Sequence, residues 1–344
     1  MNTTLYFDEV LLLIEALPSF HTDELLLANR KINLCTPSME LRRLFLPSLQ
    51  HLVVNKTDNQ SELTIWYVEE KDLKQKLKAP PWTGFNGQGY NASLNQEDVQ
   101  IFFQPWQKQL FLYSKSKKTG IYWVSDSHFV PWWECTFSFR IIFHLWTQDL
   151  PAQLVHSGAM AKNGEAVLIT GKSGSGKSTS CLNLLRAGYN YLGDDYVWVE
   201  LSDTIKVYTL YQTGKIETEN LEERFSDWKP FIINKQDYLH QKAIFDIKNL
   251  YPKSFVSSAV LKAILLPTVA YQEYTSFETA SQIKALMAMA PTTLHHLPHN
   301  RTNSYNKMIM ISSKLSSFDW LLGRDFNQFI SSFDVFISNE ITNN

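Results

Sequence analysis

The stretch Ala166-Val-Leu-Ile-Thr-Gly-Lys-Ser-Gly-Ser-Gly-Lys-Ser178 decides the fold of this 344-residue chain. Its second half has the spacing G-x-x-x-x-G-K-[ST], in which a glycine-rich loop lets backbone N–H groups cradle a phosphate. Lys177 would contact the β- and γ-phosphates of a nucleotide, and the Ser178 hydroxyl would ligate Mg²⁺. We therefore predict ATP and Mg²⁺ as ligands, with the phosphates held by Gly171, Lys172, Ser173, Gly174, Ser175, Gly176, Lys177, Ser178 and Thr179.

The residues on either side of this loop predict a strand and a helix. Residues 166–170 are an apolar, β-branched run typical of a buried strand, and residues 178–187 have the composition of a helix. Gly188 stands where a C-terminal helix cap belongs. Strand, loop and helix in this order aim the partial positive charge of a helix N-terminus at an anion. The alternative is a glycine-rich turn between two packed elements.

Charge and composition narrow the classes of partner. A formal net charge of −2 gives no electrostatic footprint for nucleic acid, which weakens a helicase or polymerase interpretation. The three cysteines, Cys35, Cys135 and Cys181, have no paired spacing, so we expect neither disulfides nor zinc, and a cytoplasmic setting. The apolar run 137–146 falls short of the roughly 20 residues that cross a bilayer, and the run 10–14 lacks the basic flank and cleavage pattern of a signal peptide. We expect no nucleic-acid or membrane partner. A homo-oligomer is compatible with the sequence.

Two domains are predicted. Residues 1–133 contain strand-like runs at 61–68, 99–103, 110–113 and 120–124, bounded by turn residues, and indicate an α+β domain whose role could be substrate recognition. Residues 134–150 are apolar on nearly all sides and predict a buried connecting helix. Residues 151–344 then form an α/β domain around the loop, closed by a packing helix that Asp325 caps.

Two adjacent carboxylates, in Leu192-Gly-Asp-Asp195, follow the loop helix. A phosphoryl transferase needs a carboxylate for its metal ion and often a second group that accepts the hydroxyl proton. Adjacent strand residues face opposite ways, so the two acids should do different jobs. One would face Mg²⁺ beside Ser178 and the other the acceptor. A solvated Gly-Asp-Asp turn is the alternative.

His156 lies just upstream of the loop strand, in Leu154-Val-His-Ser-Gly-Ala-Met160. The turn Lys162-Asn-Gly-Glu165 has hairpin spacing. A hairpin there would bring His156 back along the loop strand, within reach of the phosphate end. A structural histidine with satisfied hydrogen bonds is the alternative.

In this order, the segments 154–159, 166–178 and 192–195 resemble the HPr kinase/phosphorylase family and its carboxykinase-like relatives. The resemblance covers the chain from about residue 150 onward. It implies an α/β P-loop domain like that of HPr kinase and PEP carboxykinase, which phosphorylates a serine hydroxyl with ATP and Mg²⁺. Position by position, it implies that Asp194 binds Mg²⁺ with Ser178, that Asp195 is the base, and that His156 and Lys177 assist transfer.

The chain departs from that family in two places. Its first half does not resemble the family's N-terminal domain, and the Gly-Arg-Asn signature is missing; Gly323-Arg-Asp325 is better interpreted as a helix cap. Both departures put HPr itself in doubt as the substrate. The expected acceptor is instead a hydroxyl on a peptide, protein or small molecule.

Other charged residues could complete the site. Lys215, Lys242 and Arg301 follow strand or turn signals and could steady phosphate charge in the transition state, although each alone is typical of a surface residue. The cluster His295-His296-Leu-Pro-His299 suggests a metal site, but Pro298 prevents a regular helical ligand face. We do not expect a metal there.

Three functions remain after these steps. The leading hypothesis is a kinase that transfers the γ-phosphoryl group of ATP to a hydroxyl. The second is a nucleotide-gated binding or scaffold protein, which would hold ATP without transferring a phosphoryl group and would not need the carboxylates of Asp194 and Asp195. A nucleoside-triphosphate hydrolase would need a water-positioning residue, which the sequence does not identify.

Overall fold

The computed structural model describes the chain except residues 1, 56–59, 95–97, 271, 298–300 and 342–344. The chain divides into two compact units, one of residues 1–150 with 297–301 and the other of residues 151–296 with 302–344. The segment predicted to connect two domains, 134–150, lies within the first unit. Across the described ranges, no helix has the length and apolar character to span a bilayer.

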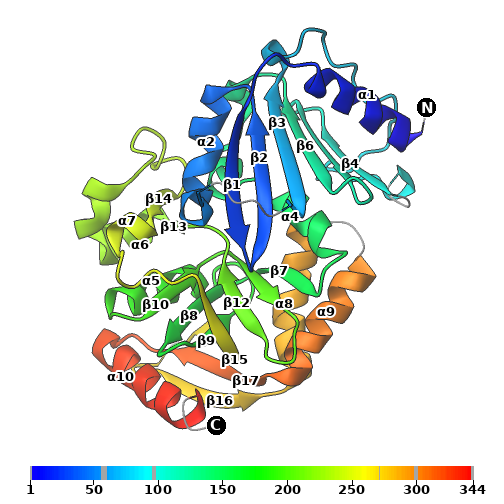
Figure 1. Cartoon of the computed structure of the whole chain (residues 1–344). Helices are drawn as coiled ribbons and strands as arrows, with labels where there is room; N and C mark the ends of the chain where they lie inside the picture. The colour runs from blue at the N-terminus through cyan, green and yellow to red at the C-terminus, as the bar shows by residue number, and fades with distance from the viewer. Residues whose placement is uncertain (1, 56–59, 95–97, 271, 298–300, 342–344) are drawn as a thin grey trace. The chain divides into compact units, whose positions relative to one another are not determined.

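The first unit is built on a mixed sheet with the strand order β1-β2-β3-β6-β5-β4 (Figure 1). Strands β2, β3 and β6 run parallel to one another, and the remaining neighbours are antiparallel. The four predicted strands correspond to β3, β4, β5 and β6, whereas β1 and β2 were not predicted. The elements are α1 (Thr3–Glu15), β1 (His21–Leu27), β2 (Arg30–Thr36), α2 (Met39–Leu49), η1 (Gln50–Leu52), β3 (Leu63–Glu69), η2 (Glu70–Asp72), η3 (Ala92–Leu94), β4 (Val99–Gln104), β5 (Gln109–Ser114), β6 (Thr119–Val124), η4 (Ser127–Phe129), α3 (Trp132–Thr136) and α4 (Arg140–Thr147).

The single connecting helix predicted over 134–150 is wrong. The segment forms two short helices, α3 and α4, separated at Phe139, whose backbone is left-handed (φ 58°, ψ 21°). The Ser138 hydroxyl donates to the carbonyl of Phe45 (2.9 Å), and the Phe139 ring packs 5.0 Å from the Phe45 ring. A left-handed backbone costs about 1–2 kcal/mol for a residue with a side chain. Full burial of Phe139 offsets that cost, so tertiary packing overrides the helical pattern.

The second unit has a larger mixed sheet with the order β10-β8-β9-β15-β12-β11-β7, to which β17 adds beside β15 and β16 beside β17. A separate two-stranded sheet pairs β13 with β14. The elements are β7 (Ala152–His156), β8 (Gly158–Lys162), β9 (Glu165–Ile169), α5 (Lys177–Arg186), β10 (Asn190–Gly193), β11 (Tyr196–Glu200), β12 (Lys206–Thr209), β13 (Thr213–Ile216), α6 (Thr218–Arg224), η5 (Ser226–Phe231), β14 (Ala243–Asp246), α7 (Ile247–Leu250), β15 (Ser258–Val269), β16 (Ser276–Ala280), α8 (Gln282–His296), α9 (Arg301–Lys314), β17 (Ser316–Leu322), α10 (Phe326–Phe336) and η6 (Ile337–Ile341).

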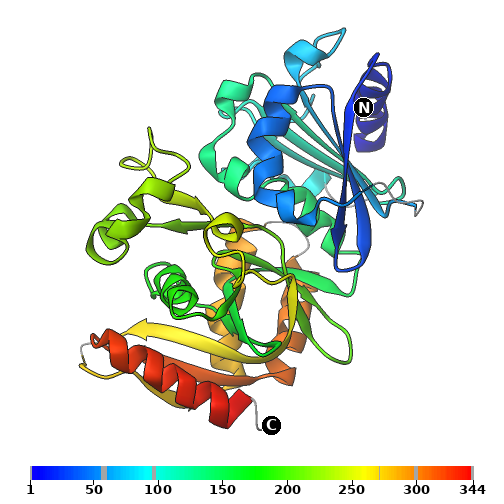
Figure 2. The ribbon, with the colours of Figure 1, turned by 60° about the vertical axis from the view of Figure 1, so that its left-hand side comes forward.

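Helices cover both faces of this larger sheet. Along β9, Val167 and Ile169 belong to one apolar core with residues of α5 and α10, whereas Ala166 and Leu168 belong to another with residues of α8 and α9. This alternation is the period of two that a strand buried on both faces imposes. Figures 1 and 2 show α8 and α9 together, away from α10. The sheet and both helical layers therefore hold the loop at the end of β9 in a fixed frame.

Candidate functional site

The predicted phosphate loop, residues 171–178, leaves the C-terminal end of β9 and enters α5. Strand β9 lies parallel to β15, and β15 lies parallel to β17, so the loop is at the carboxyl edge of this parallel group. Gly176 caps α5 with a left-handed backbone (φ 101°), and a Cβ there would lie 2.7 Å from Cδ1 of Leu322. Only glycine fits this position. The loop is thus a backbone turn pressed against β17, with the N-terminus of α5 behind it.

Lys177 folds back over the loop. Its Nζ donates to the carbonyl of Gly171 (2.8 Å) and to that of Lys172 (3.1 Å), and the side chain is buried. Burial lowers the pKa of the Lys177 ammonium, because desolvation disfavours its charged form. The Lys177 ammonium is thus hydrogen-bonded to two carbonyl groups of the loop, and phosphate oxygens could take the place of these carbonyls as acceptors.

The two aspartates lie at a break in one long antiparallel ladder. Tyr196 of β11 is opposite His156 of β7, and Gly193 of β10 is opposite Ala159 of β8, although the β10–β8 register shifts between Gly193 and Tyr191. Between these pairs, one chain passes through residues 157–158 and the other through residues 194–195. Because regular pairing stops there, the side chains at the break are free to make other contacts.

Asp195 is held between two nitrogen donors. Its Oδ1 lies 3.0 Å from Nε2 of His156, and its Oδ2 accepts a 2.8 Å bond from Nζ of Lys215, on β13. The side chains of Asp195, His156 and Lys215 are 9%, 12% and 12% exposed. Burial alone would raise the pKa of Asp195, but the charge of Lys215 and then the His156 contact outweigh it and hold that pKa well below its ordinary range.

Asp194 makes a different set of contacts. Its Oδ1 accepts from the Tyr191 hydroxyl (3.0 Å) and its Oδ2 from the backbone N–H of Lys215 (3.2 Å), while its main-chain carbonyl accepts from the Ser178 hydroxyl (3.4 Å). Burial, followed by the nearby charge of Asp195, raises the pKa of Asp194 to about 6. The two acids therefore have different partners and opposite shifts, and the contact with Ser178 runs through the backbone of Asp194 rather than its carboxylate.

The predicted hairpin is present and positions His156. Strands β8 and β9 pair across the turn at Asn163 and Gly164, with Gly158 opposite Ile169 at the loop end. The backbone N–H of His156 donates to the Thr293 hydroxyl of α8 (3.1 Å). Within the described part of the chain, Nδ1 of the His156 ring has no hydrogen-bond partner and is shielded from solvent.

His296 also belongs to this group, which the sequence reasoning missed. Its exposed ring, at the C-terminal end of α8, packs edge-on against the His156 ring with centroids 4.7 Å apart. The sequence offered His296 only as part of a metal cluster, of which Pro298 and His299 lie outside the described residues. Over the described residues, no group of three His, Cys, Asp or Glu side chains is placed to hold a metal ion. No local sequence pattern marks His296. Its position beside His156 depends on the packing of α8 against β7, which is a tertiary contact.

Of the other basic candidates, Lys215 joins the site and two do not contact it. Lys242 pairs with Glu217 (2.6 Å), yet its charge still contributes to the lowered pKa of Lys177. Arg301 groups with the first unit, where its charge acts on Tyr90. In the loop itself, Lys172 and Ser173 are exposed, whereas Ser175 is buried.

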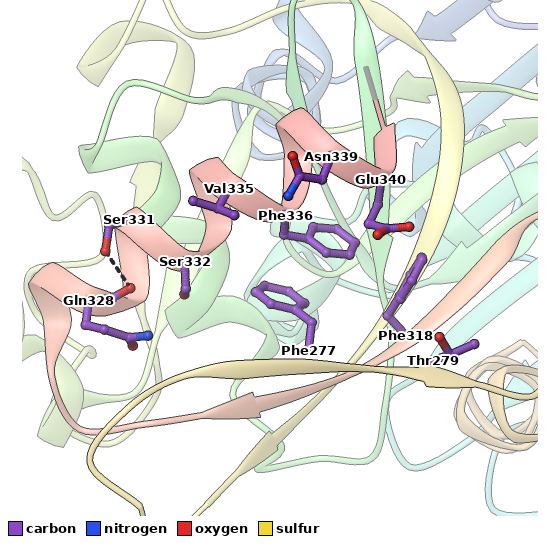
Figure 3. Close-up of a pocket in the computed structure, with 10 residues that line it drawn as sticks. All are labelled: Phe277, Thr279, Phe318, Gln328, Ser331, Ser332, Val335, Phe336, Asn339 and Glu340. Atoms are coloured by element: carbon purple, nitrogen blue, oxygen red, sulfur yellow. Dashed lines mark hydrogen bonds between the residues drawn. The ribbon is translucent and has the colours of Figure 1, made fainter. Parts of the chain in front are cut away.

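A hollow of about 440 Å³ lies elsewhere in the second unit (Figure 3). Phe277 of β16, Phe318 of β17 and Phe336 of α10 direct their rings into it, and polar residues of α10 form its rim. None of its lining residues belongs to the phosphate loop or contacts Asp195. The loop remains the candidate site, because buried charged groups converge beside it, whereas the hollow is lined by three phenylalanines, a valine and six polar residues of which one, Glu340, is charged.

Comparisons with known proteins add little to this geometry. No family model matches the chain, and no curated protein matches it. One solved structure that does match is the HPr(Ser) kinase/phosphatase from Coxiella burnetii, with 12% identity over 53% of this chain and 93% of that chain and a TM-score of 0.29. These values indicate a distant fold relationship at most and carry no argument about the site.

Proposed function

We propose that this protein is a kinase that uses ATP and Mg²⁺ to phosphorylate a hydroxyl, with serine on a peptide, protein or small molecule as the expected acceptor. The observation that carries the proposal is the contact between Ser178 and the main chain of Asp194. It joins the N-terminus of α5, which suits a phosphate, to a pair of buried acids. A loop that only bound a nucleotide would not need that pair.

The phosphate loop would hold the nucleotide. Its backbone N–H groups and the α5 N-terminus would bind the phosphates, and Lys177 would exchange its two carbonyl partners for β- and γ-phosphate oxygens. The Ser178 hydroxyl and the Asp194 carboxylate would hold Mg²⁺; each Asp194 oxygen accepts one hydrogen bond and so retains a lone pair. The ion would supply charge neutralisation for the transferred group.

The group around Asp195 would serve the acceptor. A hydroxyl loses its proton as its oxygen bonds to the γ-phosphorus, so a proton acceptor must lie beside it. The Asp195–His156 pair supplies one. Lys215, 2.8 Å from Asp195, supplies a positive charge that can stabilise the phosphoryl oxygens during transfer.

Labelled ATP tests the proposal. The protein is incubated with [γ-³²P]ATP, Mg²⁺ and either cell extract or candidate peptides, and the labelled residue is located by fragmentation. Label on a hydroxyl, absent with the Lys177→Ala variant, is the expected result. Label found only as inorganic phosphate indicates a hydrolase, and ATP bound but unchanged indicates a binding protein. Either of these results contradicts the proposed kinase.

A further inference from the structure

We infer that His156, at its Nδ1 atom, takes the proton of the acceptor hydroxyl, and that Asp195 is a positioning residue that holds the imidazole in place. The inference deepens the proposed function and depends on it. It changes the role that the family resemblance implies for Asp195, which is that of the base.

The hydrogen bonds of Asp195 argue against a direct role. Both carboxylate oxygens already face a donor: Oδ1 faces Nε2 of His156, and Oδ2 faces Nζ of Lys215. The carboxylate is also buried, with 9% of the side chain exposed. Each oxygen retains a second lone pair, but taking up a proton would neutralise the charge that pairs with Lys215, and removing a partner from a buried ion pair is costly. The geometry instead makes Asp195 a fixed acceptor between its two partners.

His156 has the opposite pattern. When Nε2 carries the hydrogen that it donates to Asp195, the neutral ring presents a lone pair at Nδ1. That atom is buried, and it has no hydrogen-bond partner among the described residues. Buried polar atoms are nearly always paired, so a vacant acceptor on the residue that contacts Asp195, the neighbour of Asp194, is a place for a substrate donor. A base oriented by a carboxylate on its far nitrogen is a recurring arrangement for activating hydroxyls.

The transfer step balances on these groups. The acceptor O–H proton moves to Nδ1 of His156 while the acceptor oxygen forms a bond to the γ-phosphorus. The bond from the γ-phosphorus to the β–γ bridging oxygen breaks, and ADP leaves with that electron pair. The resulting imidazolium is stabilised by the Asp195 carboxylate 3.0 Å away. The imidazolium then releases its extra proton, which leaves His156 neutral for the next turnover.

The tautomer of His156 gives a test that does not depend on activity. Nitrogen-15 NMR of histidine-labelled wild-type protein, assigned with the His156→Gln variant, reports which ring nitrogen carries a proton. We expect a protonated Nε2 and a bare Nδ1 at the pH of the assay. A bare Nε2 with a protonated Nδ1 overturns the inference, and so does a doubly protonated ring, because neither has a lone pair at Nδ1.

Kinetics give the second test, with [γ-³²P]ATP, Mg²⁺ and N-acetylserinamide as the acceptor probe. We expect His156→Ala to lower kcat by about 10²–10⁴-fold, the usual contribution of a general base, with ATP affinity retained. Added imidazole should restore part of the rate in this variant and have no effect on wild type or on His295→Ala, whose exposed ring neighbours His296. A folded, ATP-binding His156→Ala protein that keeps the wild-type rate, or that imidazole leaves unchanged, overturns the inference.

Two further comparisons keep the test decisive. If His156→Ala does not fold, His156→Gln retains a donor for Asp195 without a basic nitrogen and should show the same loss. Asp195→Asn should slow transfer without abolishing it; complete loss in Asp195→Asn beside an active His156→Gln would return the base role to Asp195. A wild-type protein that binds ATP but labels neither the probe nor any cellular acceptor contradicts the kinase itself, whereas the NMR result stands independently.

Discussion

Nε2 of His156 lies 3.0 Å from Oδ1 of Asp195, although the two residues are 39 positions apart in the chain. The antiparallel ladder brings them together, because Tyr196, the neighbour of Asp195, is the register partner of His156. The turn that links β8 to β9 then carries the chain from this ladder into the phosphate loop. A single run of paired strands therefore sets the geometry of both the acid–histidine pair and the loop.

Lys177→Ala should weaken ATP binding. The substitution removes a charge-assisted contact worth about 1.5–3 kcal/mol, which is roughly 10- to 150-fold in Kd. Lys172→Ala is the matched control, because that exposed neighbour should contribute only its backbone to the phosphates. Isothermal titration with ATP and Mg²⁺ measures both. Equal affinities for the two variants would mean that the loop does not bind phosphate as assigned.

Lys215→Met should destabilise the protein far more than Lys242→Met. The Lys215–Asp195 pair is largely buried, and loss of one partner leaves an uncompensated charge at a cost of about 3–5 kcal/mol. The Lys242–Glu217 pair has side chains 34% and 58% exposed, and such pairs contribute about 0–1 kcal/mol. Urea unfolding measures both costs. Adding Asp195→Asn to Lys215→Met should recover part of the lost free energy of unfolding. If none is recovered, Lys215 and Asp195 are not energetically coupled.

Asp194 should make stability fall with rising pH when Mg²⁺ and nucleotide are absent. Its pKa is raised from 3.8 to about 6, so the folded state binds more protons than the unfolded state between these values. From this group the free energy of unfolding should decrease by about 2 kcal/mol between pH 4 and pH 6, out of about 3 kcal/mol in all, and level off above about pH 7. Asp195, whose pKa is lowered, has the opposite effect. It makes the free energy of unfolding rise with pH, and it does so only below about pH 4.

Urea unfolding across this pH range, for wild type and Asp194→Asn, checks the prediction. The asparagine variant resembles the protonated acid, so its stability should be nearly constant over the window in which wild type loses stability. If the stabilities of wild type and Asp194→Asn change by the same amount between pH 4 and pH 6, the Asp194 carboxylate is not destabilised by its burial.

Gly158→Ala should disturb the phosphate loop from the opposite side of α5. A Cβ at Gly158 would collide with Sγ of the buried Cys181 on that helix. Overpacking of this kind costs about 1–3 kcal/mol, and relief by movement of α5 would shift its N-terminus and weaken ATP binding. Adding Cys181→Ala should restore both stability and affinity. Thermal unfolding and ATP titration of the three variants decide whether α5 is positioned by this contact.

Local pattern was enough to predict several elements. The strand–turn–helix around residues 171–178, the β8–β9 hairpin and the Asp325 cap of α10 each follow from a few consecutive residues with a specific turn or cap chemistry, whereas phosphate binding at that turn stays a prediction. Strands β1 and β2 were not predicted, although the left-handed turn between them contains Asn29 (φ 63°), a turn residue, beside Ala28 (φ 48°), which gives no such signal. The break at Phe139 was not predicted because packing on Phe45, rather than local sequence, causes it.

The composition of the site needed tertiary structure. The sequence identified Lys177, Asp194, Asp195 and His156 as candidates, but only the family resemblance, and no contact, assigned different roles to the two acids. Their difference comes from partners far along the chain: Tyr191 and the Lys215 backbone for Asp194, and the Lys215 ammonium with His156 for Asp195. Whether these residues perform the proposed roles stays a prediction.

The most direct test of the central claim is the ratio of phosphoester to ADP formed from [γ-³²P]ATP by the wild-type protein with its labelled acceptor. The proposed kinase predicts one stable phosphoester for each ADP, with both products lost in Lys177→Ala. ADP accompanied by an equal amount of inorganic phosphate and no phosphoester, or ATP that remains intact, would contradict it.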